Sequence, residues 1–483
     1  MSRFTRRDTI QLGAGALAGA TLLRPRWAGA QQSYAVKDVT PPEIAVEDGA
    51  TLRVARPSKF VDGDERLFFE NTNKFTEATG VQVTIDLEAW EDLRPKTAVA
   101  ANIGSGPDII LGWLDDPHQF PDKLVDLTDI AEYLGEKYGG WFDAPKAYGV
   151  NPADGRWIAM PIGTGGGVIN YRKSWFEEAG FSEFPTDYDG LLKVCQALNQ
   201  AGHPPGFALG NAVGDGNAWT HWILWGFGSS LVDENNQVVV DNPKTVEALE
   251  YAKELYATFI PGTLSWLDPN NNKAFLAGEI GLTHNGISIY YVAKNSEDPA
   301  QQAIAEDLQH ARPPIGPAGV PTETSLTVNT FIFNHTPYPN AARAYLLHMF
   351  EEEQYAPWQE ACIGYWQHTL AAYDNMPFWT EDPKTTPFRD IAKNLKPYFY
   401  KGTPGYHSAA VLADYVVVNM FASVCSGDAT PKEAATEAQR RAERYYKVCR
   451  RRFFLPGPQN AARAFRPLRR HPLRQSIPGC SHA

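Results

Sequence analysis

An alternation of strand-like and helix-like segments near the start of the chain constrains the fold most strongly. Residues 51–55, 81–86 and 108–111 predict strands, because they are short, rich in apolar residues and bounded by glycine or charged residues. Residues 65–78 and 93–103 predict the helices that connect them. This order produces a mainly parallel sheet with helices on its faces. The sequence therefore predicts an α/β fold in which ligands lie at the carboxyl ends of the strands.

The rest of the 483-residue chain continues in the same style without repeating the sequence, and its length predicts more than one domain. Residues 167–171 predict a further strand. Thr186 with Asp189 three positions later is a capping box that predicts the start of a helix. One long helix is expected over residues 340–360, and a last helix over residues 430–447.

The first 30 residues have the pattern of an export signal. Basic residues, including Arg6 and Arg7, precede an apolar stretch at 12–23, and small residues ending at Ala30 form a cleavage site. The apolar stretch is too short to span a bilayer. The adjacent arginines favour a twin-arginine signal, with an ordinary secretory signal as the alternative. We therefore expect a soluble periplasmic protein in which residues 31–49 form an N-terminal extension.

The charge of the chain is unevenly distributed. Residues 448–483 hold eight Arg and no acidic residue, whereas the chain between the export signal and this tail holds 31 basic and 55 acidic residues. A body this acidic argues against a nucleic-acid partner and against adhesion to an anionic membrane. The tail is either a basic segment for an anionic partner or a disordered or non-native extension, and the abrupt reversal of charge favours the second interpretation.

Motifs for catalysis and for metals are missing. The chain has no G-x-S-x-G, H-E-x-x-H or P-loop motif, and its five cysteines show no C-x-x-C spacing. The glycine-rich stretch at 163–167 leads into a strand instead of a helix, so the argument for a phosphate site fails. The cysteines at 195, 362 and 425 are expected to be buried apolar residues. We predict no catalytic residue, no metal and no cofactor, although the many carboxylates leave a glycosidase pair open.

The most distinctive chemical feature is the occurrence of tryptophans beside polar residues in segments expected to be loops. A flat ring covers the CH face of a sugar, while carboxylates and amides hydrogen-bond its hydroxyl groups. For any single tryptophan, a place in the core is an equally good interpretation. The clusters are Trp90 with Glu91, Trp113 with Asp115 and Asp116, Trp219 with Asn217, and Trp366 with Tyr365.

Six segments, in order and at matching spacing, carry a family pattern over roughly residues 50–447. Residues 75–86 (FTEATGVQVTID) resemble K-F-x-x-x-T-G-[IV]-x-V-x-[VI], and residues 104–110 (GSGPDII) resemble G-x-x-P-D-[IV]-[IV]. The other four segments are 160–173, 180–198, 275–282 and 312–317. Together they resemble the extracellular solute-binding proteins of bacterial ABC importers, in the carbohydrate-binding family 1 group that includes maltose-binding proteins.

This resemblance implies the two-lobe periplasmic-binding-protein fold of type II, with the ligand in a cleft between lobes joined by crossing hinge segments. Lobe 1 would comprise residues 50–166 and 325–365, and lobe 2 would comprise residues 167–324 and 366–447. Binding would shift a hinge equilibrium from open to closed. The partners would be a small carbohydrate and the membrane permease of the importer, and the protein would be a monomer without enzymatic activity.

The resemblance and the positions of the strand ends together predict the residues that contact the ligand. Segments after the first three strands, the crossing strand, the second lobe and a late loop all contribute. The predicted ligand-binding residues are Lys59, Asp62, Trp90, Glu91, Trp113, Asp115, Asp116, Thr164, Gly165, Asn217, Trp219, Asn285, Tyr290, Trp366, Tyr406 and His407.

Three functions remain open at this stage. The first is a sugar-binding or oligosaccharide-binding transport protein. The second is the same fold with another solute: a phosphorylated polyol would require basic residues in the cleft, and a polyamine would require several acids. The third is a periplasmic glycan-active enzyme, which turnover of a glycan would reveal. The sequence does not specify the solute.

Overall fold

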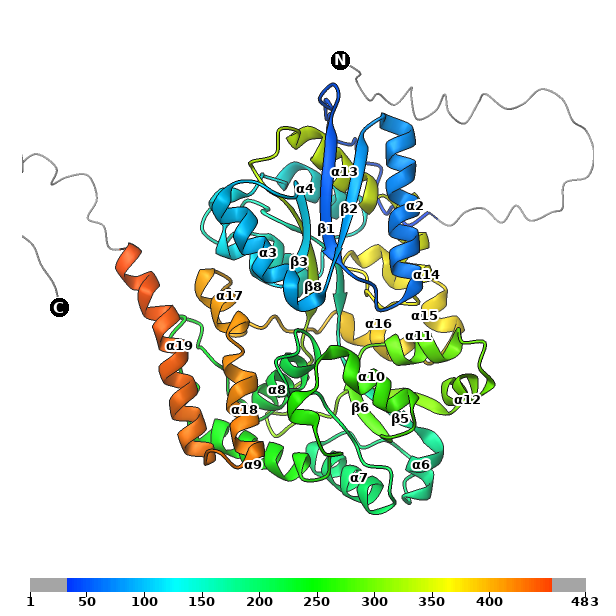
Figure 1. Cartoon of the computed structure of the whole chain (residues 1–483), viewed down its shortest axis with the longest axis vertical. Coiled ribbons are helices and arrows are strands. Elements are labelled where there is room, and N and C mark those ends of the chain that lie inside the picture. Colours follow the sequence, from blue (N-terminus) through cyan, green and yellow to red (C-terminus); the bar gives the residue numbers. More distant parts are fainter. Residues whose placement is uncertain (1–32, 454–483) are drawn as a thin grey trace, which may run out of the picture.

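The computed structural model describes residues 33–453, with side chains as far as Tyr446, and it divides into two α/β lobes. In Figure 1 the lobe that contains the five-stranded sheet lies above the lobe that contains the three-stranded sheet; we call them lobe 1 and lobe 2. The order of strands in lobe 1 is β2-β1-β3-β8-β4. These strands are β1 (Thr51–Pro57), β2 (Gln82–Glu88), β3 (Ile109–Trp113), β4 (Met160–Gly165) and β8 (Leu326–Ile332).

The sheet of lobe 1 confirms the predicted β-α-β-α-β order. Strand β1 pairs in parallel with β2 and β3, whereas β8 pairs antiparallel with β3 and β4. The connecting helices are α2 (Asp62–Thr79) and α3 (Trp90–Ile103). Each of these helices ends at a glycine in the left-handed conformation, which residues with a side chain rarely adopt. The carboxyl ends of β1 and β2 point toward lobe 2 (Figure 1).

Lobe 2 contains an antiparallel sheet of order β6-β5-β7, covered by helices. The strand predicted at 167–171 is confirmed as β5. The expected capping box at Thr186 is wrong in register, because the side chain of Asp187 caps the helix by accepting from the N–H of Gly190. The elements are β5 (Val168–Arg172), β6 (Leu282–Asn285), β7 (Leu308–Ala311), α6 (Lys173–Glu178), α7 (Tyr188–Gln200), α8 (Asp215–Gly226), α9 (Pro243–Tyr256), α10 (Asp268–Leu276), α11 (Ser288–Lys294) and α12 (Pro299–Asp307).

The single helix expected over residues 340–360 is two helices. Helix α13 (Pro339–Phe350) and α14 (Glu352–Ala361) are separated at Glu351, whose backbone is extended. The carboxylate of Glu351 accepts hydrogen bonds from Tyr133 and Tyr138 and forms an ion pair with Lys137. These contacts on α4 (Thr128–Lys137) and the residue after it offset the loss of the helical bond at this position.

The last helices run along one side of the molecule and connect the two lobes (Figure 1). Helix α17 (Tyr406–Ala413) packs on η1 (Asp116–Gln119) of lobe 1, and α18 (Val416–Ser426) packs on α8 and α9 of lobe 2. Residues 406–426 are apolar enough to span a membrane by length and composition, but 56% of this stretch is buried in the fold. A positive φ at Tyr415 separates the two helices.

The final helix, α19 (Pro431–Phe453), begins with the predicted capping interaction between Thr430 and Glu433. The helix does not end near residue 447 as expected, because its hydrogen-bonded backbone continues to Phe453. The first residues of the predicted tail are therefore helical. The remainder of the tail, residues 454–483, and the predicted export signal lie outside the described residues.

Three passages connect the lobes: β4 to β5, β7 to β8, and the chain after residue 372. Residues 367–372 hydrogen-bond to lobe 1, for example between the backbones of Gln367 and Thr164, so we place the last passage after them instead of at residue 366. The short helices of this passage are η4 (Ala371–Asn375), α15 (Phe378–Glu381) and α16 (Thr386–Ala392). Remaining short elements are η2 (Pro121–Lys123), α5 (Asp143–Gly149) and η3 (Thr263–Ser265).

Candidate functional site

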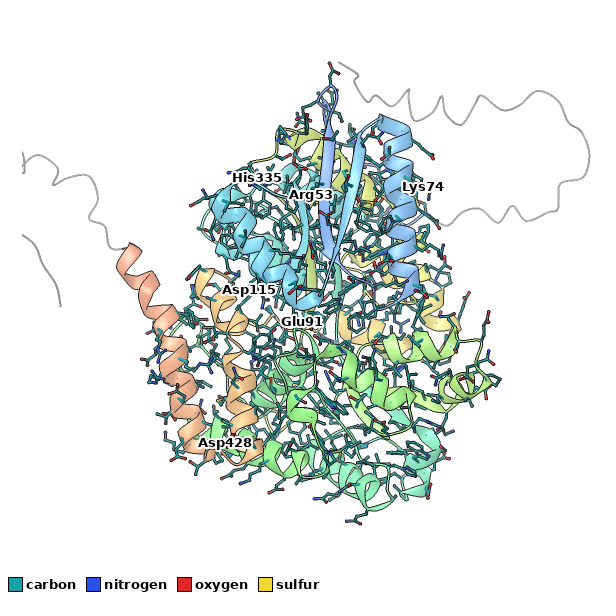
Figure 2. All side chains as sticks on the ribbon, viewed as in Figure 1. Arg53, Lys74, Glu91, Asp115, His335 and Asp428 are labelled. Carbon is teal, nitrogen blue, oxygen red and sulfur yellow. The ribbon has the colours of Figure 1, made fainter. Side chains whose placement is uncertain are left out.

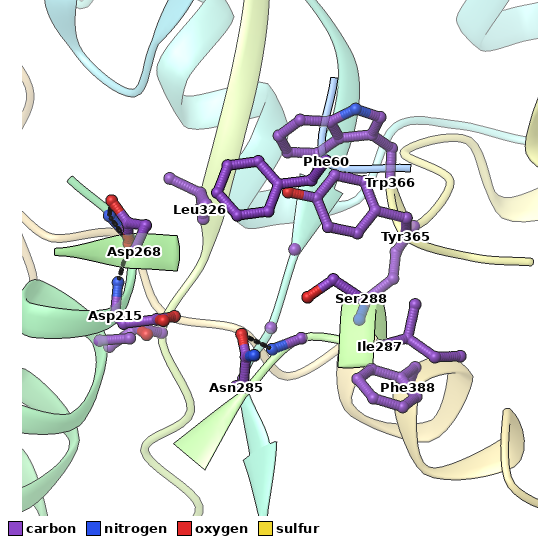
Figure 3. Close-up of a pocket in the computed structure, with 18 of the residues that line it drawn as sticks. Phe60, Asp215, Asp268, Asn285, Ile287, Ser288, Leu326, Tyr365, Trp366 and Phe388 are labelled. Carbon is purple, nitrogen blue, oxygen red and sulfur yellow. Dashed lines mark hydrogen bonds between the residues drawn. The ribbon is translucent and has the colours of Figure 1, made fainter. Parts of the chain in front are cut away.

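A cavity of about 590 Å³, which includes open space at its mouth, lies between the two lobes. Lobe 1 and the passage after it supply aromatic residues, and lobe 2 supplies polar residues from α8, α10, β6 and α11. Figure 3 shows Phe60, Tyr365 and Trp366 together on one side of this cavity, with Asp215 and Asp268 on another. We call the rings of Phe60, Trp90, Tyr365 and Trp366 the aromatic wall.

The aromatic wall is a packed cluster of rings. Trp90 contacts Phe60 edge to face at 4.5 Å and stacks on Trp366 at 6.0 Å between ring centroids. Phe60 stacks on Tyr365 at 6.1 Å. The indole N–H of Trp90 donates to the backbone oxygen of Ser58 at 3.0 Å. These contacts fix the ring planes, so the wall presents preformed apolar faces to the cavity.

The polar side of the cavity is centred on a pair of carboxyl groups at the start of α8. Asp268 Oδ1 accepts from the N–H of Asp215 at 2.7 Å and from the N–H of Gly214 at 3.0 Å. Asn271 donates to Asp215 Oδ2 at 2.7 Å. These bonds hold both side chains in place and satisfy two backbone N–H groups at the start of the helix.

The environment of this pair favours the protonated form of each acid. Burial raises the pKa of Asp268 to about 6, while the backbone N–H groups of Asp215 and Gly214 oppose the rise. Burial, followed by repulsion from Asp268, raises the pKa of Asp215 well above its usual range. Because the two groups interact strongly, they titrate as a pair, and the pair retains a proton to higher pH than two exposed acids would.

Amides and a hydroxyl complete the floor of the cavity. Asn272 donates to the hydroxyl of Ser288 at 2.9 Å and accepts from Asn285. The side chain of Asn285 also accepts from the N–H of Gly286 at 2.7 Å. Asn285 and Ser288 both line the cavity, so this network orients groups that can exchange hydrogen bonds with a ligand.

The glycine-rich stretch is a tight crossing between the lobes. A Cβ atom on Gly166 would lie 2.4 Å from a methyl carbon of Ile391, and one on Gly167 would lie 2.0 Å from the ring of His284. Real side chains do not fit at those distances. Close packing where the chain passes from β4 to β5 therefore explains the glycines. Gly165, Gly166 and Gly167 all line the cavity.

The structure brings only part of the predicted site together. The predicted residues that line the cavity are Trp90, Gly165, Asn285 and Trp366. Glu91 is exposed in the first turn of α3, close enough to raise the pKa of Asp268 by repulsion, and Figure 2 shows it at the boundary of the lobes. Trp113 is fully buried behind the wall, where its ring packs on Trp90 at 4.4 Å.

Several predicted residues serve other contacts. Trp219 and Asn217 are not in a loop but in α8, where both are buried; the apolar environment of this helix explains the error. The predicted residues that pair elsewhere are Lys59 with Asp62, Asp116 with Arg94, Thr164 with Ser325, Tyr290 with Asp382, and His407 with the ring of Tyr446. Tyr406 is about half exposed at the start of α17, outside the residues that line the cavity.

Asp115 is sealed beneath α17 instead of lining the cavity. It is 1% exposed, and neither of its carboxylate oxygens has a hydrogen-bond partner. The nearby hydroxyl of Ser408, on α17, lowers the pKa of Asp115 without reaching hydrogen-bond geometry, but burial dominates and raises this pKa to about 7. Figure 2 shows Asp115 near the boundary of the lobes.

Other residues that line the cavity were not predicted from the sequence, among them Phe60, Asp215, Asp268, Ser288, Tyr365 and Gln367. Asp268 precedes a proline that opens a helix, which predicts a cap instead of a ligand contact. Asp215 lies in the first turn of α8. The acid that it contacts, Asp268, is more than fifty residues away in sequence. Only Tyr365 carried a usable signal, since it adjoins the predicted Trp366.

Comparison with known proteins identifies the family. The family profile described as bacterial extracellular solute-binding protein matches residues 71–387. A binding protein of Brucella abortus is 21% identical over 379 residues, covering 77% of this chain and 89% of the relative. An ABC transporter-binding protein of Deinococcus radiodurans is 26% identical over 196 residues, covering 38% of this chain and 46% of the relative.

Solved structures confirm the two-lobe fold. The GacH receptor of Streptomyces glaucescens superposes with a TM-score of 0.69 at 19% identity, covering 82% of this chain and 99% of the receptor. Maltose-bound MalE3 of T. maritima gives 0.67 at 19% identity, with the same coverage. The matched family is one of extracellular solute-binding proteins, and an ABC transporter periplasmic-binding protein of Escherichia coli is a further relative, 26% identical over 191 residues, which is 38% of this chain and 42% of that protein. The chain belongs to the bacterial extracellular solute-binding proteins, the solute-binding components of ABC transporters.

Proposed function

We propose that this protein captures a sugar or polyol in the cavity between its lobes and delivers it to the membrane permease of an ABC importer. The observation that carries the proposal is the opposition of the aromatic wall to the polar floor of Asp215, Asp268, Asn285 and Ser288. Rings cover the CH faces of a sugar, and the floor exchanges hydrogen bonds with its hydroxyl groups.

The relatives support this class of solute. A solved protein of Agrobacterium vitis carries bound D-mannitol, and a solved protein of Arthrobacter chlorophenolicus carries laminaribiose. The erythritol/L-threitol-binding protein of Mycolicibacterium smegmatis is 26% identical over 140 residues, which is 25% of this chain and 28% of that protein. In the part of the chain that the structure describes, no lysine or arginine lines the cavity, which disfavours a phosphorylated polyol.

The cavity supports binding without chemistry. A glycosidase places two carboxyl groups on either side of the scissile bond. Asp215 and Asp268 both belong to lobe 2, and the backbone N–H of Asp215 bonds the carboxylate of Asp268. The two acids therefore lie next to each other and not on either side of a bound sugar. We therefore propose that the solute is released unchanged.

We further propose that the protein acts as a monomer in the periplasm, after the export signal, of twin-arginine type, is removed near Ala30. The basic pair Arg6-Arg7 and the apolar stretch behind it support this route. Twin-arginine export would deliver both lobes already folded.

A binding screen tests the function. The chain from residue 31 onward is titrated with sugars, polyols, sugar phosphates and polyamines in a thermal-shift assay. A ligand at 100 times its Kd stabilises the folded state by about 2.7 kcal/mol. We expect concentration-dependent shifts with sugars or polyols and recovery of the ligand unchanged. Shifts only with sugar phosphates, or turnover of a glycan, would contradict the proposal. Mass spectrometry of the denatured protein shows whether a co-purified solute already fills the cavity.

A further inference from the structure

Two acidic side chains of lobe 2, Asp215 and Asp268, line the cavity. Among residues 33–446, no lysine, arginine or histidine lines the cavity beside these two acids. Asp268 uses one oxygen to hold the start of α8, and Asp215 uses Oδ2 to accept from Asn271. Within residues 33–446 no donor is recorded for Asp215 Oδ1. Asp215 is only partly buried, so this oxygen is open to a donor on a ligand.

A second group in the same cavity has the same requirement. Gln367 lines the cavity and is 1% exposed, and its Oε1 atom is buried without a hydrogen-bond partner. A buried oxygen that accepts no hydrogen bond is unfavourable, and a donor on a ligand would satisfy it. Gln367 hydrogen-bonds through its backbone to Thr164 of lobe 1, and Asp215 comes from lobe 2, so the two acceptors belong to different lobes.

The aromatic wall adds a further preference. The faces of aromatic rings carry negative potential, and they attract a cation within about 6 Å. Four rings of the wall line the cavity that also contains the two acids. Acids together with a cluster of aromatic rings, and no protein cation between them, favour a positively charged group on the ligand over a neutral one.

We infer that the solute carries a basic nitrogen in addition to its hydroxyl groups, so that the protein recognises an aminated sugar or polyol whose ammonium group lies at Asp215. This inference rests on the proposed function and narrows its class of solute. The ammonium group would donate to Asp215 Oδ1, and the hydroxyl groups would bond to Gln367, Asn285 and Ser288. A phosphate or carboxylate on the solute would find no basic side chain to pair with among the described residues that line the cavity.

Proton linkage follows from the same geometry. The groups that act electrostatically on the pair are Glu91 from α3 and the tyrosines Tyr365, Tyr398 and Tyr415. All of them are acidic or neutral at pH 7. Because burial and mutual repulsion raise the pKa of each acid in the pair, an arriving ammonium group lowers those pKa values and releases a proton. A neutral sugar has no charge with which to do so.

The test uses matched pairs of probes that differ only in one hydroxyl or amine. Glucose is compared with glucosamine, and sorbitol with glucamine, by isothermal titration at pH 7 in two buffers of different ionisation enthalpy. We expect the aminated member of at least one pair to bind at least tenfold more tightly. We also expect its apparent enthalpy to change with the buffer, as proton release requires.

A variant locates the ammonium group. Asp215→Asn should lower the affinity for the aminated probe at least tenfold and the affinity for the neutral probe less than threefold. The control is Asp241→Asn in the same lobe, which removes an acid that bonds Lys432 and Thr436 outside the cavity and should change neither affinity. Circular dichroism checks that both variants fold, and the buffer comparison on the unmodified protein does not depend on either variant.

The outcomes separate the inference from the proposed function. Equal binding of both members of each pair, with no proton release, would overturn the inference and leave sugar or polyol binding intact. Binding of linear polyamines without any aminated sugar or polyol would overturn both. No binding of any of these probes would overturn the inference, and failure of the broader screen would decide against the proposed function.

Discussion

The backbone N–H of Gly63 donates a hydrogen bond of 2.9 Å to the hydroxyl oxygen of Tyr291, and this bond joins the first turn of α2 in lobe 1 to α11 in lobe 2. Gly63 is tightly packed, since a Cβ atom there would lie 2.1 Å from the backbone oxygen of Ala361. The N–H groups of a first helical turn lack partners within their own helix. A hydroxyl from the opposite lobe therefore completes this helix only when the lobes are together.

Tyr291→Phe should weaken solute binding without changing the stability of the unliganded protein. The substitution removes one hydrogen bond between the lobes, with a net value of about 0.5–1.5 kcal/mol, which corresponds to a loss of about two- to tenfold in affinity if binding holds the lobes together. Titration calorimetry with the best-binding sugar or polyol measures the loss. Tyr338→Phe, at the start of α13, is the control and should leave the affinity unchanged. Equal affinities for both variants would show that the bond does not favour closure.

The sequence predicted the parts of the fold that local patterns encode. The alternation through residues 51–111 predicted the order of β1 to β3 with α2 and α3 between them, and the structure confirms it. This prediction succeeded because apolar periodicity and glycine stops are local signals. Contacts across the chain account for the errors. The break at Glu351 depends on two tyrosines and a lysine that are more than 200 residues away.

The candidate site was harder to predict than the fold. Trp90 and Trp366 were predicted from their polar neighbours and line the cavity, whereas Trp219 has a similar neighbourhood in sequence and is core. Sequence does not show which side of a helix faces a neighbouring lobe. Asp215 and Asp268 are 53 positions apart, and only the packing of α10 against the start of α8 brings them together.

A matched pair of tryptophan substitutions separates the wall from the core. Trp366→Leu should lower the affinity for the best-binding sugar or polyol at least tenfold, because a stacking face of the cavity is lost. Trp219→Leu should instead lower the free energy of unfolding by about 3 kcal/mol, since its ring is fully buried and its N–H donates to the backbone of Ala208. Urea unfolding and calorimetry measure the two effects. An unchanged Kd for Trp366→Leu would exclude the wall from the binding site.

A buried ion pair behind the cavity makes a separate prediction about stability. Arg56 and Asp64 form an ion pair at 2.5 Å with almost no exposure, and Asp64 also accepts from the indole N–H of Trp358 at 3.0 Å. Asp64→Ala should cost about 3–5 kcal/mol, because it leaves the Arg56 charge buried and unpaired. Adding Arg56→Met should restore part of this loss in urea unfolding. A double variant less stable than Asp64→Ala would contradict that account.

Asp115 provides the sharpest prediction about pH. Burial raises its pKa from an ordinary value of 3.8 to about 7 in the folded state. Between these two pH values the folded state holds a proton that the unfolded state has released, so stability falls as pH rises through this window. Asp115→Asn removes the effect. The variant should therefore be more stable than the parent at pH 8, on the order of a few kcal/mol, and the difference should shrink toward pH 4.

The neighbouring Asp116 is the matched control: burial raises its pKa as well, but the charge of Arg94 opposes that rise. Asp116 is equally buried but forms an ion pair with Arg94 at 2.6 Å, whereas the oxygens of Asp115 have no hydrogen-bond partner. Asp116→Asn leaves a buried guanidinium without its counter-charge and should destabilise the protein at pH 8. Urea unfolding of the parent and both variants at pH 4, 6 and 8 measures the difference. Loss of stability in both variants at pH 8 would contradict this account. It would mean that Asp115 is ionised in the folded state and that a partner stabilises its charge.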